Sequence, residues 1–329
     1  MYKPILLTIV VFCFAMNAKS QQLNKKPVSI IFDSDMGPDY DDVGAIAMLH
    51  AFADRGEAKI LATMASTNYE GVAGVLDVFN TYFKRPNIPI GVPKGKALDL
   101  RDFQHWTDTV LAKYPHKLKS NVEAQDAITL YRKILSAQPD KNVTIVTIGF
   151  LTNMSNLLLS GPDKYSPLDG RQLVAKKVKQ LISMAGKFPE GWEFNVMKDA
   201  PASQNAFDHW PTPVILSGFE IGEKIKVGLT LIHNTSIKNS PVKDVFSLSI
   251  PMAKEDSIGR KSWDETAVLV AVRGYTHYYT LHPGRVKVLD AGNNTWNDAG
   301  KGHFYLVEKM PARQVENLIN ELIMHQPRR

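Results

Sequence analysis

The stretch VSIIFDSDMGPDYDDVGAIAMLHAF, residues 28–52, joins two apolar runs through a cluster of acids. The first run, Val28–Asp33, has the length and composition of a buried strand. The second, Asp42–Phe52, is rich in Ala, Ile, Met and Leu, which favour helix. Five aspartates fall within the ten residues 33–42. The acids are therefore expected on a strand-to-helix turn, where open α/β sheets place their ligands.

Carboxylates crowded this closely repel one another, and a folded chain tolerates them when a cation, a proton or a bound polyol compensates the charge. Hard cations such as Ca²⁺ prefer several carboxylate oxygens. We therefore expect a divalent-metal and polyol site, with Asp35 and Asp42 as candidate ligands and Asp41 as a candidate partner of sugar hydroxyls that also caps the helix. The alternative, a polar turn with one N-cap aspartate, accounts for one acid rather than five.

Two other acidic motifs are disfavoured. A phosphatase of the haloacid dehalogenase type has Thr or Val where this chain has Gly37. An EF-hand loop lies between two helices and ends in a Glu. This loop follows a strand and has no such Glu.

Strand and helix patterns alternate along the rest of the chain, which indicates βαβ units and a single α/β domain with a mostly parallel sheet flanked by helices. The expected strands are Val28–Asp33, Lys59–Ala65, Ile88–Val92, Val143–Ile148, Gln180–Ala185 and Val214–Ser217. The expected helices are Asp42–Phe52, Gly71–Phe83, Val122–Ala137, Asn153–Leu159, Ala202–Phe207 and Glu265–Arg273. A C-terminal hairpin (Arg285–Asp290 with His303–Val307) and a final helix (Pro311–Met324) are expected to complete it. Asp99–Lys119 shows neither period and is expected to be a long loop over the site.

Residues 1–20 have the features of a secretory signal peptide: Lys3 is followed by an apolar stretch and by small residues suited to cleavage before Gln21. Residues 21–27 are then expected to form a polar leader, and residues 28–329 the single folded domain. We expect a secreted or periplasmic protein with no membrane segment after cleavage; an uncleaved N-terminal anchor is the alternative. Since Cys13, the one cysteine, lies in the signal segment, the mature chain is expected to have no thiol chemistry.

The formal net charge of +6 does not indicate a nucleic-acid site. The basic residues are scattered, and the small cluster at Lys176, Lys177 and Lys179 has no aromatic residues interleaved. A solvated surface is the favoured interpretation.

Three later segments could complete the acidic site. The turn TIGFLTN, residues 147–153, offers backbone carbonyls to a hard cation, and Gly149 allows close approach. Glu193 and Asn195 stand two apart on one face of an extended segment and could hold adjacent ribose hydroxyls. Asp264 could close a metal shell, and Trp263 beside it could offer a flat aromatic face. Each segment alone also fits a structural role: a glycine turn, a surface strand, or an N-cap with a core Trp.

Taken in order, the motifs DSD…DD, GFLTN, EFN and WD resemble those of the nucleoside hydrolase family, inosine–uridine preferring and related ribohydrolases, over residues 28–325. The resemblance implies a mostly parallel α/β fold, a bound Ca²⁺ and hydrolysis of the N-glycosidic bond of ribonucleosides to base and ribose. It implies that Asp35 is the general base that activates the water nucleophile. The Ca²⁺ ligands that it implies are Asp35, Asp42, Asp264 and the backbone carbonyl of Ile148. The ribose-binding residues that it implies are Asp41, Asn68, Glu193 and Asn195, with Asp33 behind them.

The chain departs from the family pattern in two places. The acidic loop is two residues longer than the usual turn, so Asp39 could stand in for Asp41. The asparagine usually found several residues before Glu193 has no clear match in residues 187–191.

Trp263 resembles the purine-preferring branch of the family, in which a Trp stacks on the base where many members have a His. Trp106, from the long loop, is the expected second aromatic face, with His105 and Trp192 as rivals. The expected function is therefore Ca²⁺-dependent ribonucleoside hydrolysis with a lean toward purines, as in purine salvage. The alternatives are a non-catalytic nucleoside- or sugar-binding protein on the same fold, or a hydrolase of another N-riboside. Whether the chain forms a homo-oligomer stays open.

Overall fold

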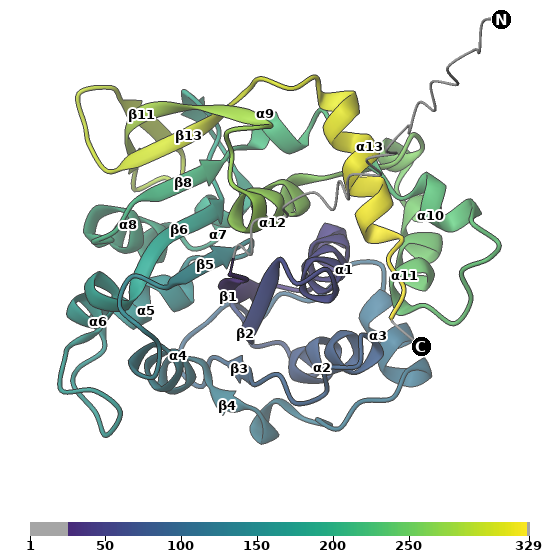
Figure 1. Ribbon diagram of the computed structural model, residues 1–329, viewed down its shortest axis with the longest axis horizontal. Coiled ribbons are helices and arrows are strands. Elements are labelled where there is room, and N and C mark those ends of the chain that lie inside the picture. Colours follow the sequence, from purple (N-terminus) through teal and green to yellow (C-terminus); the bar gives the residue numbers. More distant parts are fainter. Residues whose placement is uncertain (1–25, 328–329) are drawn as a thin grey trace, which may run out of the picture.

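A sheet of eleven strands runs through the molecule in the order β4-β3-β2-β1-β5-β6-β8-β13-β11-β12-β7, as the computed structural model of residues 26–327 shows (Figure 1). The first eight strands of this order pair in parallel, and the last three pairings are antiparallel. The strands are β1 (Val28–Ser34), β2 (Ala58–Ala65), β3 (Ile90–Val92), β4 (Gln125–Asp126), β5 (Val143–Thr147), β6 (Val178–Met184), β7 (Glu190–Gly191), β8 (Val214–Ser217), β11 (Tyr279–Val288), β12 (Asn294–Asn297) and β13 (His303–Glu308). A separate pair, β9 (Lys226–Val227) and β10 (Arg260–Lys261), lies outside this sheet. The expected single α/β domain with a mostly parallel sheet is confirmed.

Helices cover both faces of the sheet (Figure 1). One face packs against α1 (Asp41–Asp54), α2 (Val72–Tyr82), α11 (Pro241–Ser249), α12 (Trp263–Arg273) and α13 (Ala312–Ile323). The other packs against α4 (Ala127–Ser136), α5 (Thr152–Leu159), α6 (Gly170–Lys177) and α8 (Ala200–His209). Shorter helices are α3 (Trp106–Lys113), α7 (Phe194–Lys198), α9 (Phe219–Gly222) and α10 (Leu229–His233), with three 3₁₀ turns at Asn121–Glu123, Ile250–Met252 and Lys254–Asp256. Because β1 and β5 are covered on both faces, their residues are buried in succession, without the alternation of a half-exposed strand.

Helix α1 is apolar on all sides because it is itself buried, between the sheet and helices α12 and α13. Its first turn carries Asp41 and Asp42. The strand that precedes it, β1, lies at the centre of the sheet. This places the acidic turn at the carboxyl ends of the central parallel strands.

The helix expected at Val122–Ala137 begins only at Ala127, after a 3₁₀ turn and strand β4. Two other expected segments differ from the structure. Asp99–Lys119 is not a featureless loop, since it contains α3, whose buried residues Trp106, Thr107 and Val110 pack toward the core. At the C-terminus, the expected pairing of Arg285–Asp290 with His303–Val307 is wrong. The first half of β11, Tyr279–Gly284, pairs with β13, and Arg285–Val288 pairs with an additional strand, β12, on the other edge of β11. Single-sequence patterns are weak for both, since a helix of 8 residues and a strand of 4 residues offer few periods.

The predicted signal peptide and Cys13 lie outside the described residues. Within residues 26–327, none of the helices combines the length and the apolar character that crossing a bilayer requires.

Candidate active site

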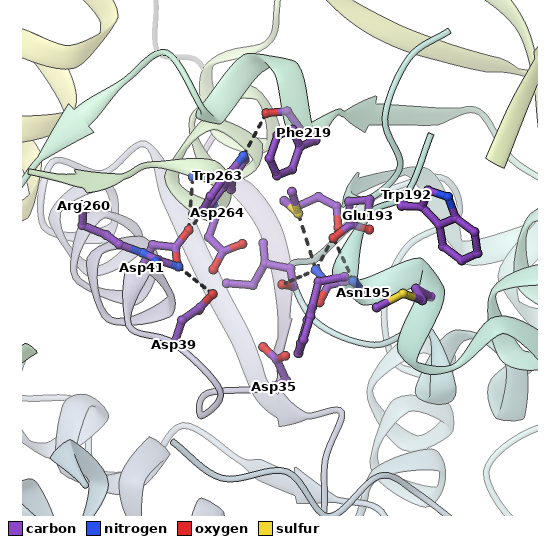
Figure 2. Close-up of a pocket in the computed structure, with 14 residues that line it drawn as sticks. Asp35, Asp39, Asp41, Trp192, Glu193, Asn195, Phe219, Arg260, Trp263 and Asp264 are labelled. Atoms are coloured by element: carbon purple, nitrogen blue, oxygen red, sulfur yellow. Dashed lines mark hydrogen bonds and ion pairs between the residues drawn. The ribbon is translucent and has the colours of Figure 1, made fainter. Parts of the chain in front are cut away.

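A cavity of about 370 Å³ opens where the central parallel strands end (Figure 2). Its acidic side consists of Asp35, Asp39, Asp41 and Asp264, with Arg260 among them. The rest of the lining comes from the residue after β5, from the end of β6 and the segment that follows it, and from the first residues of α9 and α12: Ile148, Met184, Trp192, Glu193, Phe194, Asn195, Met197, Phe219 and Trp263. Five regions that are distant in the sequence, 35–41, 148, 184–197, 219 and 260–264, therefore meet at one site.

Asp42 is fully buried behind the cavity and lies next to Asp35. Its Oδ1 accepts from Ser34 Oγ (2.5 Å) and from the backbone N–H of Met36 (3.1 Å). Its Oδ2 is buried with no hydrogen-bond partner among residues 26–327. Burial, followed by the charge of Asp41, raises the pKa of Asp42 to about 6. Burial, followed by the charges of Asp42 and Asp39, raises the pKa of Asp35 well above its usual value.

Asp264, in the first turn of α12, adds a further carboxylate from the other end of the chain. It is buried, and its pKa is raised well above the usual value, first by burial and then by Asp41, Asp42, Asp39 and Asp35. One carboxylate oxygen each of Asp39, Asp41 and Asp264 lies within 4.8 Å of the others. A cation would relieve this repulsion, so the cluster could bind a metal ion.

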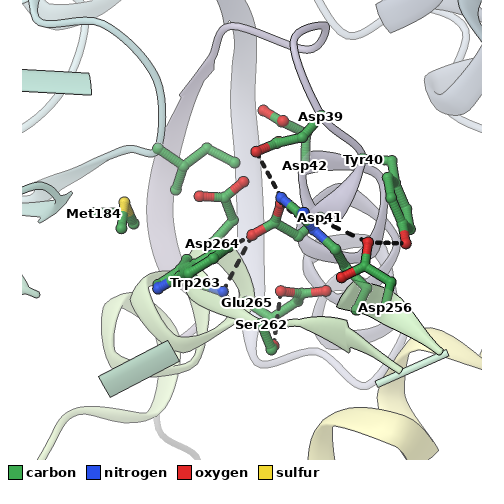
Figure 3. A network of polar contacts seen from close by, with 12 residues as sticks. Asp39, Tyr40, Asp41, Asp42, Met184, Asp256, Ser262, Trp263, Asp264 and Glu265 are labelled. Atoms are coloured by element: carbon green, nitrogen blue, oxygen red, sulfur yellow. Dashed lines mark hydrogen bonds and ion pairs between the residues drawn. The ribbon is translucent and has the colours of Figure 1, made fainter. Parts of the chain in front are cut away.

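Asp41 is committed to protein partners (Figure 3). Its Oδ1 accepts from Nε and Nη2 of Arg260, at 3.1 and 2.7 Å. Its Oδ2 accepts from the backbone N–H groups of Trp263 (3.1 Å) and Asp264 (3.4 Å). Asp41 therefore caps the start of α12, a helix that follows it by more than 200 residues, rather than its own helix α1.

The turn after β5 approaches the acids closely. A Cβ on Gly149 would lie 2.3 Å from the backbone nitrogen of Asp35 and 2.5 Å from Ser66 Oγ, so this position requires glycine. Ile148, the residue before Gly149, lines the cavity. Its carbonyl, a predicted metal ligand, accepts a hydrogen bond from Asn195 Nδ2 at 3.1 Å. The close approach that Gly149 was expected to allow is present.

Glu193 and Asn195 both line the cavity and are buried. Glu193 is the N-cap of α7: its two oxygens accept from the backbone N–H groups of Gly186, Asn195 and Val196 at 2.8–3.1 Å. Burial raises its pKa to about 7. Asn195 donates through Nδ2 to the carbonyls of Ile148 and Met184, which leaves its side-chain oxygen for a hydroxyl donor. The extended segment predicted here instead turns into a short helix after Glu193.

Asp33 lies behind the cavity, fully buried at the end of β1. Its Oδ2 accepts from Tyr131 (2.7 Å) and Asn153 (2.9 Å). Burial raises its pKa to about 7. Asn68, by contrast, is outside the set of residues that line the cavity, and its backbone N–H donates to Leu98.

The aromatic residues at the cavity are Trp263, Phe219, Trp192 and Phe194. Trp263 and Phe219 have ring centroids 5.1 Å apart, and Trp263 Nε1 donates to the carbonyl of Phe219 at 2.8 Å (Figure 2). Trp192, a rival for the second aromatic face, lies at the rim and is 53% exposed.

The choice of Trp106 as the second aromatic face is wrong. Trp106 is fully buried at the start of α3, is not among the residues that line the cavity, and donates through Nε1 to the carbonyl of Asp39 at 3.0 Å. The large apolar ring of a Trp is stabilised more by burial in the core than by a place at the cavity rim, and α3 within Asp99–Lys119 allows that burial. His105, the other rival, is also outside the cavity lining and is largely exposed.

Arg260 and Phe219 are the cavity residues that sequence reasoning missed. Arg260 has no motif around it, and its role arises from three acids that the fold brings to it: Asp39, Asp41 and Asp256. Phe219 lies just after the carboxyl end of β8, and the carboxyl ends of parallel strands are where ligands bind. That position was the one sequence signal that could have predicted Phe219 at the cavity.

Comparison with known proteins identifies relatives by family and by fold. A family model described as inosine-uridine preferring nucleoside hydrolase matches residues 30–315. A search of curated proteins returned no match. Among solved structures, a plant nucleoside hydrolase has 18% identity and a TM-score of 0.69, covering 91% of this chain and 99% of its own. The inosine-uridine preferring nucleoside hydrolase from Bacillus anthracis has 13% identity and a TM-score of 0.68, with 90% and 99% coverage. The purine-preferring ribonucleoside hydrolase from Gardnerella vaginalis has 15% identity and a TM-score of 0.69, with 90% and 98% coverage.

Proposed function

Since this chain belongs to the inosine-uridine preferring nucleoside hydrolase family, whose fold it shares, we propose that it is a Ca²⁺-dependent hydrolase of purine-leaning ribonucleoside specificity. Hydrolysis of the ribonucleoside N-glycosidic bond follows from the family. The cation and the base preference are the proposed parts. The observation that carries the cation is the unpartnered, buried Oδ2 of Asp42 next to the carboxylates of Asp35 and Asp264. The observation that carries the base preference is the pair of aromatic rings, Trp263 and Phe219, in the cavity lining.

The residues at the site suit a hard cation. Asp35, Asp42, Asp264 and the carbonyl of Ile148 would hold it, since all four supply oxygen and three supply negative charge. Asp41 is not included, because Arg260 and two backbone N–H groups already occupy its oxygens. A Ca²⁺ ion bound there would neutralise the carboxylates and acidify the attacking water.

Asp35 is proposed as the general base. Its carboxylate lines the cavity and lies next to Asp42. Its burial excludes competing water, and its carboxylate would take the proton that the nucleophile loses. The acids around it face the sugar ring, where cleavage of the glycosidic bond develops positive charge, so they stabilise the transition state electrostatically.

Asn195 is proposed to bind a ribose hydroxyl through its side-chain oxygen. Glu193 orients Asn195 by accepting its backbone N–H. Trp263 and Phe219 are proposed to contact the base, and stacking on a purine would favour purine nucleosides over pyrimidine nucleosides because the purine ring is larger.

Release of ribose from inosine, guanosine, adenosine, uridine and cytidine, each with Ca²⁺ and with chelator, tests this proposal. Hydrolysis of the purine nucleosides that stops on chelation and returns with Ca²⁺ is expected. Binding without release of ribose would support the non-catalytic alternative, and release from nicotinamide riboside alone would support a hydrolase of another N-riboside.

A further inference from the structure

The acidic loop contains two carboxylates, Asp39 and Asp41, that could hold the ribose hydroxyls, and the structure separates their roles. The side chain of Asp41 is 2% exposed, and the side chain of Asp39 is 45% exposed. Both line the catalytic cavity. The partners of Asp41 are four N–H groups of the protein itself, two from Arg260 and two from the start of α12.

A carboxylate with four good N–H donors has little remaining capacity for a substrate hydroxyl, because its two oxygens offer about four acceptor positions. Exchanging one of these charge-assisted hydrogen bonds for a hydroxyl would leave a buried guanidinium or backbone N–H without a partner, which is costly. Asp41 is therefore a structural residue that ties α1 to α12.

Apart from the neighbouring carboxylate of Asp41, the side-chain partner of Asp39 is Arg260, whose Nη2 lies 2.6 Å from its Oδ2. Arg260 is itself held rigidly. Its guanidinium lies 5.0 Å from the ring centroid of Tyr40 and 5.2 Å from that of Trp263, with Asp256 at 3.7 Å. The backbone of Asp39 is held as well, since Trp106 Nε1 donates to its carbonyl.

We propose that Asp39, which the lengthened loop supplies, has replaced Asp41 as the carboxylate that binds the ribose hydroxyls, and that Arg260 is the positioning residue for both acids. The inference rests on the proposed function. Arg260 orients Asp39 toward the cavity through one nitrogen and withdraws Asp41 from substrate through the same group. The two extra residues of the loop are thus functional: they present a second aspartate at the point where the first has been engaged.

The test compares inosine with 2′-deoxyinosine and 3′-deoxyinosine in the wild-type protein and in Asp39→Asn, Asp41→Asn and Glu255→Gln. Glu255 is an exposed carboxylate close to the site and is the matched control. For Asp39→Asn we expect kcat/KM on inosine to fall about 100-fold, while kcat/KM on the analogue that lacks the hydroxyl bound by Asp39 changes less than about threefold. Asp41→Asn is expected to lower kcat/KM by one common factor for all three substrates and to lower Tm. Glu255→Gln is expected to change none of these values.

Two outcomes overturn the inference: loss of hydroxyl discrimination in Asp41→Asn with discrimination retained in Asp39→Asn, or an equal loss on all three substrates in Asp39→Asn. Should Asp41→Asn fail to fold, the Asp39→Asn profile alone decides. Arg260→Met is expected to raise KM for inosine and to weaken discrimination between inosine and the deoxy analogue. Arg260→Lys, which keeps the positive charge, is expected to show the same two changes to a smaller extent. A merely structural Arg260 would lower Tm and leave that discrimination unchanged.

Failure of the proposed function can be distinguished from failure of this inference. If the wild-type protein hydrolyses no N-riboside, the hydrolase proposal fails, and the same variants are then compared by calorimetric binding of ribose. Unchanged ribose affinity in Asp39→Asn would overturn the inference in that case as well, and weakened affinity in that variant alone would support it.

Discussion

The hydroxyl of Ser34, the last residue of β1, donates to Oδ1 of Asp42 in the first turn of α1 at 2.5 Å. This hydrogen bond fixes the rotation of the Asp42 carboxylate. Its other oxygen, Oδ2, is left buried and unpartnered among residues 26–327. Five acids within ten residues thus fold into an ordered group in which each carboxylate has a different environment, and the environments differ enough to be tested one at a time.

Asp35→Asn is expected to keep the fold and to lower kcat on inosine by about 10²–10⁴-fold, the usual contribution of a general base. Because burial and neighbouring acids already disfavour the charge of Asp35, its removal is expected to leave Tm unchanged or higher in the presence of chelator. Steady-state kinetics and thermal melts measure both effects. A kcat near that of the wild type would exclude Asp35 as the base.

Removal of the divalent cation is expected to abolish turnover and to lower Tm by several degrees. A ligand present at about 100 times its Kd stabilises the native state by about 2.7 kcal/mol, and chelation removes that contribution. Melts and inosine hydrolysis before and after exhaustive chelation, with Ca²⁺ or Mg²⁺ added back, check this. If neither Tm nor activity responds, the assignment of the acids to a cation site is wrong.

The cation-free protein is expected to lose stability as the pH rises from 5 to 8. Burial raises the pKa of Asp33 to about 7, of Glu193 to about 7 and of Asp42 to about 6, against values near 4 in the unfolded chain. The folded state therefore binds more protons in this window. The resulting stability is fully present below about pH 4 and is lost as the pH passes the folded-state values, with a slope of up to about 1.4 kcal/mol per pH unit for each group.

Denaturant titrations in chelator at several pH values measure this slope. Asp33→Asn serves as the comparison, since Asp33 lies behind the cavity and is not a proposed ligand. A shallower decline is expected in that variant between pH 5 and 8. A free energy of unfolding that rises with pH in the wild-type protein would contradict the prediction.

Trp263→Ala is expected to lower kcat/KM on inosine and guanosine far more than on uridine, since a stacked base contributes about 1–3 kcal/mol. Trp263→Phe is the control: it keeps a ring next to Phe219 and loses the Nε1 hydrogen bond to the Phe219 carbonyl. Kinetics on the three nucleosides separate the two effects. Equal losses on purine and pyrimidine nucleosides would remove base stacking as the role of Trp263.

Trp106→Phe is expected to act on stability rather than on base preference. The change removes the donor to the Asp39 carbonyl and leaves that partner unsatisfied, which costs about 1–3 kcal/mol. The ratio of kcat/KM values for inosine and uridine is expected to stay unchanged. A shift in that ratio without a change in Tm would restore Trp106 as a base contact.

The sequence by itself determined the strand–turn–helix at residues 28–52, the parallel sheet and the order in which its motifs reach the site. These features are local: apolar runs set strands and helices, and a strand end carries its acids with it. The glycine turn at Gly149 is a further case, although the atoms that it approaches, on Asp35 and Ser66, are brought there by the fold.

Only the tertiary structure decided which acid does what. Asp41 looks available in the sequence, but the fold brings it Arg260, 219 positions later, and the start of α12. The same holds for Trp106. It was expected at the cavity because no helix or strand was predicted around it, and the structure buries it in the core. A side chain's role depends on its partners in space, and hydrogen-bond donors contributed from more than 200 residues away leave no trace in the pattern around it.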